Sequence, residues 1–392
     1  MAIKHDLRYG GALTGSAEMK AIIKSIYKSN KTGNWQTASE AAKMEQEAAK
    51  FLGVKYGILT TSGSSAGLLA LSALELPKGS EVIISTVTFP TIFNIILQCN
   101  LIPVVVDAKV GTYNFDVDEV EQAIIKSKGK VKAIIAVHAV GNPCDMPRLM
   151  KVAKKYNVKV IEDNCDGWGS TIHGRKVGSF GDISITSFHA AHIVSMGVGG
   201  GVFTNDKELA NKVRQYRDWG RQAETTKPHQ VKELPKDYNP RFVYDKIGYN
   251  FQILELQAAM GRVQLRKSNL VKKLRQKNVD YLIKGLKDLP LVLPKAVEGA
   301  DVCWFSLPLS VELGQERGSL IEHLEKHGVE TRSMFSGDIT RHPAYKGAKY
   351  KVPFLLIGAS QIIKRSFWIT CHPRLKKADL DYIVKIFKEY YA

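Results

Sequence analysis

Short apolar runs alternate with helix-like segments through the first half of the chain, and this alternation restricts the possible folds most strongly. The runs are continuous and rich in valine and isoleucine, which is typical of strands buried on both faces. They lie at residues 56–61, 81–85, 102–106, 133–137, 158–162 and 202–204. The helix-like segments lie at residues 66–74, 118–126 and 146–156. We therefore predict an α/β fold with a mainly parallel central sheet and right-handed crossovers.

The second half of the chain has a different pattern. Residues 225–240 are polar and contain three prolines, which predicts an irregular excursion. Beyond it we predict a strand at 303–309 and helices at 253–265, 269–286, 319–327 and 377–391. Because 392 residues are too many for one small core, we predict a large cofactor-binding domain at 1–252 and a small C-terminal α+β domain at 253–392.

The chain is basic, with a net charge of +18 from 56 Lys and Arg against 38 Asp and Glu. A positive field favours anionic partners, either a nucleic acid or a small phosphorylated substrate. The basic residues are spread out, and their densest stretch, at 266–287, is interpreted as the solvated face of a helix. No helix-turn-helix, zinc-finger or RNA-binding pattern accompanies them, which favours the small substrate over nucleic acid.

Cysteine usage and hydropathy indicate the compartment. The five cysteines are widely spaced and form no CxxC pair, which argues against a disulfide framework or a structural zinc site. The N-terminal residues lack the apolar run of a signal peptide, and no apolar stretch of about 18 residues predicts a membrane span. We therefore expect a cytoplasmic protein with no membrane partner.

Two polar motifs follow predicted strands, where α/β enzymes bind ligands. Ser62-Gly63-Ser64-Ser65 lies between a strand and a helix, and its small residues let backbone N–H groups approach an anion at the helix N-terminus. Asp163 ends another strand, where a carboxylate could keep a pyridine nitrogen protonated. Taken singly, each motif is equally compatible with an ordinary helix cap or turn.

A third motif, SFHAAH, precedes a glycine-rich stretch and a strand. The HxxH spacing of His189 and His192 suggests a metal site. However, the motif lacks the glutamate of HExxH and a recognisable third ligand, so we predict no bound metal.

Together and in this order, these segments resemble the DegT/DnrJ/StrS family of sugar aminotransferases and dehydratases. The likeness covers nearly the whole chain, through TSGSSA, VTFPT, HAVGNPCDM, IEDNCD, SFHAAHIVSMGVGGG and GYNFQILELQAA. It implies a fold-type I enzyme that uses pyridoxal 5'-phosphate or pyridoxamine 5'-phosphate and acts on a nucleotide-diphospho keto sugar.

The resemblance also implies roles for single residues around the cofactor. Gly63, Ser64 and Ser65 match the loop that binds the cofactor phosphate, and Ser187 matches a further phosphate ligand. Phe89 matches the aromatic residue that stacks on the pyridine ring.

Three further positions carry implied roles. Asp163 matches the partner of the pyridine nitrogen, and Asp166 stands in the cofactor site where aminotransferases usually carry Gln. Asn250 matches a residue that reaches the cofactor phosphate of the neighbouring subunit, which implies a homodimer.

One position departs from the family's aminotransferases, which read SFHxxK and bind the cofactor covalently through that lysine. Here the sixth position is His192, and no lysine occurs between Lys176 and Lys207. The cofactor is then expected to be held noncovalently, as the amine. Because an imidazole titrates near neutral pH, we expect His192 to act as the general base, and we expect loss of the sugar's 3-hydroxyl in place of transamination.

A subgroup of the family, the keto-deoxysugar 3-dehydratases, reads SFxxxH at this site. Residues 331–343 (TRSMFSGDITRHP) also resemble the TR-x-x-F-x-G-N-x-x-R-Q-P segment of this subgroup, departing from it at Asp338 and His342. The likeness implies that Arg332, Phe335 and Arg341 contact the sugar nucleotide.

One branch of the subgroup carries an iron–sulfur cluster on cysteines shortly after a segment like RDWGR. Residues 222–240 contain no cysteine. This favours the other branch, similar to GDP-4-keto-6-deoxymannose 3-dehydratase, which regenerates the amine with L-glutamate. Two alternatives stay open: a noncatalytic binding protein, and an aminotransferase in which His192 was engineered from lysine. Neither the nucleotide nor the hexose is identified by the sequence.

Overall fold

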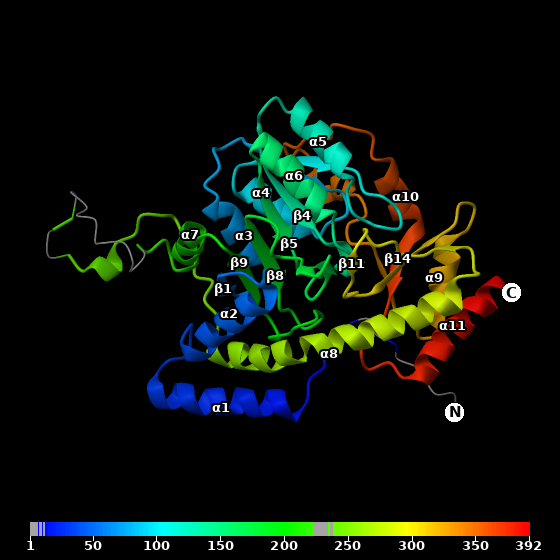
Figure 1. Ribbon diagram of the computed structural model, residues 1–392, viewed down its shortest axis with the longest axis horizontal. Helices are drawn as coiled ribbons and strands as arrows, with labels where there is room; N and C mark the ends of the chain where they lie inside the picture. Colours follow the sequence, from blue (N-terminus) through cyan, green and yellow to red (C-terminus); the bar gives the residue numbers. More distant parts are fainter. Residues whose placement is uncertain (1–6, 8–9, 11, 223–233, 236–237) are drawn as a thin grey trace.

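The computed structural model describes residues 7, 10, 12–222, 234–235 and 238–392. Most of the irregular excursion predicted at 225–240 lies outside the described residues. Within them the chain forms a large sheet covered on both faces and a smaller antiparallel sheet beside it (Figure 1).

The large sheet has seven strands in the order β1-β9-β8-β5-β4-β2-β3. All neighbouring pairs are parallel except the two that involve β9. The bounds are β1 Tyr56–Thr60, β2 Glu81–Ser85, β3 Ile102–Val106, β4 Val131–Val137, β5 Lys159–Asp163, β8 Ile183–Ser187 and β9 Gly200–Thr204. The predicted α/β fold with a mainly parallel central sheet is confirmed.

Both faces of this sheet are buried, which explains why its strands are continuous apolar runs. In β2, for example, Ile83 and Ile84 belong to core clusters on opposite faces. One face carries α3 Gly63–Ala73, α4 Pro90–Gln98 and α7 Lys207–Arg217. The other carries α2 Ser39–Leu52, α5 Val117–Lys126 and α6 Met146–Tyr156.

The C-terminal part contains the antiparallel sheet, in the order β10-β12-β14-β13. Its strands are β10 Leu291–Val292, β12 Leu307–Val311, β13 Thr331–Ser333 and β14 Ser366–Ile369, packed with α9 Arg317–Lys326 and α11 Lys377–Tyr391. The strand predicted at 303–309 was wrong in its first half. Residues 303–306 leave the sheet because the N–H groups of Cys303 and Phe305 donate to Ser170 Oγ and to the Val140 carbonyl.

The remaining elements complete the connections. A three-stranded sheet is formed by β11 Ala300–Asp301, β6 Thr171–Ile172 and β7 Arg175–Lys176, and α10 Ile357–Arg365 precedes β14. Four short 3-10 helices are η1 Ala139–Gly141, η2 Pro240–Phe242, η3 Ile339–Arg341 and η4 Pro343–Tyr345.

The long helix α8, Glu255–Leu286, connects the two parts (Figure 1). The prediction of two helices with a break near residue 267 was wrong, because the polar residues there include neither glycine nor proline and the helix continues through them. The first part of α8 packs against α1 Ser16–Thr32 and α2, whereas Leu282 and Leu286 enter the core of the small sheet. A domain boundary near residue 252, which assigns all of α8 to the small domain, remains a proposal.

Candidate active site

A cavity of about 420 Å³ opens where β1, β5 and β8 end and α3 begins. That volume lies in the range of small-molecule sites. Most of the wall comes from the large sheet and its loops, and three aromatic side chains come from the C-terminal part. The lining residues are Ser62, Gly63, Ser64, Phe89, Thr91, Ile92, Val137, His138, Asp163, Cys165, Asp166, Ile185, Ser187, His189, Ala191, His192, Val198, Gly199, Phe305, Phe335 and Trp368.

The N-terminus of α3 forms one end of the cavity. Ser62 caps the helix, since its Oγ accepts from the Ser65 N–H at 3.0 Å and the Ser65 Oγ accepts from the Ser62 N–H at 2.9 Å. This exchange leaves the N–H groups of Gly63 and Ser64 without an acceptor among the described residues. Two free donors at the positive end of a helix form a suitable cradle for a phosphate.

Glycine is required at Gly63 because the wall approaches its backbone closely. A Cβ there would lie 2.8 Å from the Cβ of Ser187 and 3.2 Å from the Sγ of Cys165. Nearby hydroxyls add donors: Ser64 Oγ lies 2.8 Å from Thr91 Oγ1, and Ser187 also lines the cavity. The structure therefore brings together three of the four predicted phosphate ligands. The hydroxyl of Ser65 is instead used within the helix cap.

At the end of β5, adjacent carboxylates face opposite ways, as expected for neighbours on a strand. Glu162 points beneath the cavity, where the N–H groups of Gly178, Phe180 and Gly181 donate to it. Asp163 lines the cavity, and burial raises the pKa of its carboxyl. A carboxyl of this kind, with no cationic side chain paired to it in the described structure, suits a cationic nitrogen of a ligand.

Cys165 lies beside Asp163 and also faces the cavity. Its N–H donates to Asp163 Oδ1 at 3.1 Å. Burial, with a further contribution from the charge of Asp163, raises the pKa of its thiol well above the ordinary value. The thiol therefore remains protonated, and it donates a hydrogen bond to the Asp163 carboxylate.

His192 stands in the cavity wall after β8. Its Nδ1 lies 3.4 Å from Asp166 Oδ1, and its ring lies 5.3 Å from that of Phe305. The side chains of His192 and Asp166 are only 16% and 9% exposed, so solvent screens the pair weakly. No lysine is found among the described residues that line the cavity.

The predicted absence of a metal site stays a prediction. His189 and His192 belong to a turn, and their ring centroids are 6.3 Å apart. The described residues contain no group of three or more side chains that could hold a metal ion.

Of the residues predicted to contact the substrate or the neighbouring subunit's cofactor, one reaches the cavity and the others lie outside it. Phe335 reaches the cavity, held at a φ of +46° that side chains rarely adopt. Arg332 and Arg341 lie outside it: Arg332 donates to the Thr331 carbonyl, and Arg341 pairs with Asp338 at 3.0 Å. Asn250 is exposed and forms a backbone bridge to Asp218. Their predicted roles remain untested.

Sequence reasoning named only Phe335 of the aromatic wall that the C-terminal part contributes, and it missed Phe305 and Trp368. The ring of Trp368 lies between the other two, with its centroid 5.9 Å from that of Phe305 and 5.0 Å from that of Phe335. Behind the wall, the guanidinium of Arg275, which is buried in α8, donates to the Phe305 carbonyl. No local pattern marks Phe305 or Trp368, because only the tertiary fold brings them to the cavity. Cys165 and His138 also went unnoticed, although both follow strands that end at the site.

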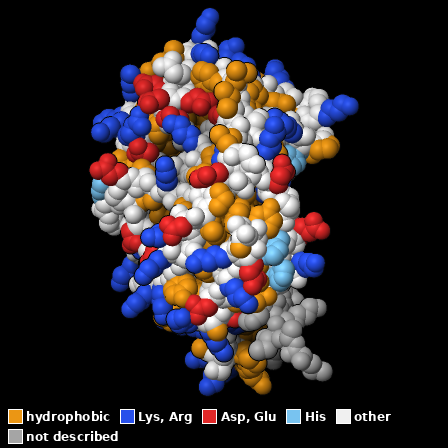
Figure 2. Space-filling model, turned by 90° about the vertical axis from the view of Figure 1, so that its right-hand side faces the viewer, with side chains coloured by type: hydrophobic (Ala, Val, Ile, Leu, Met, Phe, Trp, Pro, Cys, Tyr) orange, Lys and Arg blue, Asp and Glu red, His pale blue; other side chains and the backbone are white. Residues whose placement is uncertain are grey.

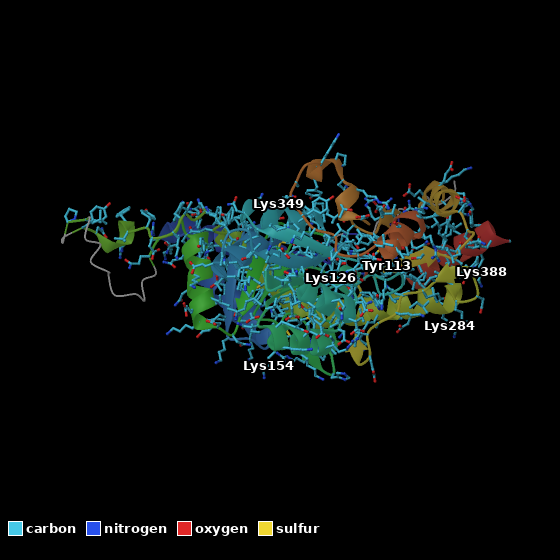
Figure 3. All side chains as sticks on the ribbon, turned by 90° about the horizontal axis from the view of Figure 1, so that it is seen from above. Tyr113, Lys126, Lys154, Lys284, Lys349 and Lys388 are labelled. Atoms are coloured by element: carbon cyan, nitrogen blue, oxygen red, sulfur yellow. The ribbon has the colours of Figure 1, made fainter. Side chains whose placement is uncertain are left out.

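Surface charge is dispersed. Figure 2 shows Lys and Arg side chains scattered over one face, with Asp and Glu among them. In Figure 3 the labelled lysines project from separate elements, namely Lys126, Lys154, Lys284, Lys349 and Lys388. Within the described residues, no helix combines the length and apolar character needed to cross a membrane.

Comparison with known proteins identifies relatives of the whole chain. Residues 16–388 match the model of the DegT/DnrJ/EryC1/StrS aminotransferase family. The lipopolysaccharide biosynthesis protein RfbH of Salmonella typhimurium is 36% identical, with 97% of this chain and 91% of RfbH covered. The dTDP-4-dehydro-2,6-dideoxy-D-glucose 3-dehydratase of Saccharopolyspora spinosa is also 36% identical, with 90% and 80% covered.

A solved structure is similar over the same extent. It is the crystal structure of GDP-4-keto-6-deoxymannose-3-dehydratase with a trapped PLP-glutamate geminal diamine. The TM-score is 0.89 at 26% identity, with 97% of this chain and 100% of that chain covered. The fold is thus that of a group of pyridoxal phosphate enzymes.

Proposed function

The chain belongs to the DegT/DnrJ/EryC1/StrS aminotransferase family and is close to its 3-dehydratases, and from this premise we propose that it removes the 3-hydroxyl of a nucleotide-linked 4-keto-6-deoxy sugar. One observation carries the proposal. The imidazole of His192 lines the cavity where the family's aminotransferases have their cofactor lysine, and no described residue of the lining is a lysine.

The cofactor is pyridoxal phosphate or its amine form, and the residues present suit it. The free N–H groups of Gly63 and Ser64 would hold the phosphate, and the buried carboxyl of Asp163 would pair with the pyridine nitrogen. Phe89, at the edge of the cavity, would cover the ring. Bound as the amine, the cofactor supplies a nucleophilic nitrogen and an electron-accepting ring.

The side chains of the chain carry out the rest of the reaction. An imidazole nitrogen of His192 would accept a proton from the methylene carbon of the cofactor and would then donate it to the departing 3-hydroxyl. The apolar wall of Phe305, Phe335 and Trp368 limits the entry of water, which strengthens the electrostatic interactions inside the site. Replacing lysine with histidine removes the group that could hold the cofactor covalently. Because the amino nitrogen of the cofactor would leave as ammonia in each turnover, the enzyme needs an amine donor, which we propose is L-glutamate.

We also propose a homodimer in which Asn250 contributes to the neighbouring site. Asn250 is exposed and lies outside the cavity of its own chain. Helix α1 exposes Met19, Ile23 and Tyr27 at successive turns, an apolar stripe that a second copy would cover. Sedimentation of the purified protein tests this: a monomer at micromolar concentration contradicts it.

The deciding experiment combines the purified protein with pyridoxamine phosphate, L-glutamate and a 4-keto-6-deoxy sugar linked to dTDP or to GDP. Release of ammonia with a 3-deoxy product supports the proposal, and His192→Asn should abolish both. An amino sugar without ammonia would identify an aminotransferase. Failure to bind the cofactor, measured from its absorbance, would favour a noncatalytic protein.

A further inference from the structure

Two buried side chains in the cavity wall form a pair that the reaction as described above leaves unexplained. Asp166, in the loop after β5, lies 3.4 Å from the Nδ1 of His192, which follows β8. We propose that Asp166 is a positioning residue, which holds the His192 imidazole in the tautomer with its proton on Nδ1 and leaves Nε2 free to accept a proton. The catalytic meaning of this pair depends on the proposed function, but the pair itself can be tested without substrate.

The surroundings of His192 favour this assignment. Its Nδ1 is buried and forms no complete hydrogen bond within the described structure, so Asp166 is the polar group in range. The Asp166 carboxylate likewise accepts no hydrogen bond from any other group among the described residues. The nearby carboxyl of Asp163 is already engaged by the N–H of Cys165.

The backbone and the aromatic wall fix the ring. The N–H of His192 donates to the His189 carbonyl at 3.0 Å, which closes the turn. Phe305 lies against the imidazole, with its plane tilted by 41°. A small rotation of the ring would therefore complete the hydrogen bond to Asp166, and catalytic hydrogen bonds are often long before ligands bind.

A carboxylate suits this position for two reasons. It accepts the Nδ1 proton, which selects the tautomer, and its charge stabilises the imidazolium that forms when Nε2 takes up a proton. Glutamine, which the family's aminotransferases usually carry here, provides no charge. A lysine in place of His192 would need neither the selection of a tautomer nor a carboxylate to stabilise an imidazolium.

The test is ¹⁵N NMR of the cofactor-free protein labelled at its ten histidines, at a pH where imidazoles are neutral. The His192 resonances are those lost in His192→Asn. His138 is an internal reference: its Nδ1 accepts from the Cys144 N–H at 3.1 Å, so its proton must be on Nε2. We expect His192 to show the opposite tautomer.

Two substitutions then isolate Asp166. Asp166→Ala should return His192 to the Nε2–H form and leave His138 unchanged, whereas Asp166→Asn, which keeps an acceptor, should retain Nδ1–H. Circular dichroism establishes that both variants are folded. An Nε2–H tautomer in the wild type, or no change in Asp166→Ala, would overturn the proposal.

Turnover and cofactor binding distinguish positioning from direct cofactor contact. Asp166→Asn should lower kcat by about 10²-fold, the lower end of what a positioned acid–base group contributes, with the affinity for pyridoxamine phosphate unchanged. Weaker cofactor binding at unchanged kcat would make Asp166 a cofactor ligand and refute a positioning role. If the NMR result holds but no dehydration is found, the pair stands and the proposed function fails.

Discussion

The Nε2 of His138 donates a hydrogen bond of 3.2 Å to Glu162, so one of two adjacent carboxylates is hydrogen-bonded on all sides beneath the cavity while the other faces it. Because Glu162 accepts from three backbone N–H groups as well, its charge is fully accommodated by the protein. Asp163 accepts only from the backbone N–H and the thiol of Cys165 and has no cationic partner in the described structure. The charge of Asp163 therefore destabilises the protein when no ligand is bound, and it attracts a cationic ligand.

Asp163→Asn should stabilise the cofactor-free protein at neutral pH. Burial raises the pKa of Asp163, so the folded state favours the protonated carboxyl. Its contribution is favourable at acid pH and is lost as the pH rises through the folded pKa, and the amide avoids that loss. We expect a thermal midpoint higher by on the order of 1–2 °C, measured by calorimetry.

The pH dependence and the cofactor supply the controls. The gain should vanish below about pH 4, where the carboxyl is protonated in both states. With pyridoxamine phosphate present the order should reverse, because the amide cannot pair with a protonated pyridine nitrogen. A gain that persists with bound cofactor would contradict the assigned role of Asp163.

Gly63→Ala should weaken binding of the cofactor phosphate by at least about tenfold, or 1.4 kcal/mol. The added methyl group would clash with Ser187 and push the first turn of α3 away from the cavity. Fluorescence titration measures the affinity. Gly318→Ala is the matched control, since Gly318 lies in the first turn of α9 with no atom within 4 Å of its would-be Cβ. That variant should bind normally and gain up to about 1 kcal/mol of stability.

His192→Lys should form a covalent cofactor adduct, and more completely when combined with Asp166→Gln. A lysine beside the Asp166 carboxylate would be held as the ammonium ion, which is not nucleophilic, and glutamine removes that charge. Visible absorbance and borohydride trapping with pyridoxal phosphate report the adduct. His189→Lys, in the same cavity wall, is the control and should form none. Equal yields in the single and double variants would contradict the electrostatic argument.

The protein purified without oxygen should contain no stoichiometric iron or acid-labile sulfide. The predicted branch has no cluster because residues 222–240 lack cysteine. Elemental analysis and the electronic spectrum measure the content, and turnover with glutamate alone is the functional counterpart. A cluster, or an absolute requirement for a reductase, would place the chain in the other branch.

The central sheet was predictable from the sequence, whereas the cavity was only partly so. Strands buried on both faces are recognisable by composition, and β2 and β3 were placed with their observed bounds. Asp163 could be considered for the site because it ends a predicted strand, now β5. Ser187 was assigned only through the family resemblance, since its strand β8 was not predicted. Helices α1, α2, α4, α7 and α10 were not predicted.

Most of the C-terminal contribution could not be predicted from local patterns. Trp368 lies in an ordinary buried strand. Phe335 was named only through the family resemblance of residues 331–343, and it reaches the cavity with a strained backbone conformation. The pairing of Asp166 with His192 likewise depends on the neighbouring position of β5 and β8 in the sheet. Motif spacing gives no information on such distances.

The cavity wall extends from Ser62 to Trp368, so its two sides are made by parts of the chain that leave the ribosome far apart in time. A nascent chain can form the parallel sheet long before the aromatic wall has been translated, because domains generally fold as units from the N-terminus. The residues assigned to the cofactor belong to the early part, so the late event in biogenesis is the closure of the aromatic wall over the site. Truncation before β14 would leave the parallel sheet with a site that is open to solvent. Such fragments should retain affinity for phosphate but should no longer protect the reacting centre from water.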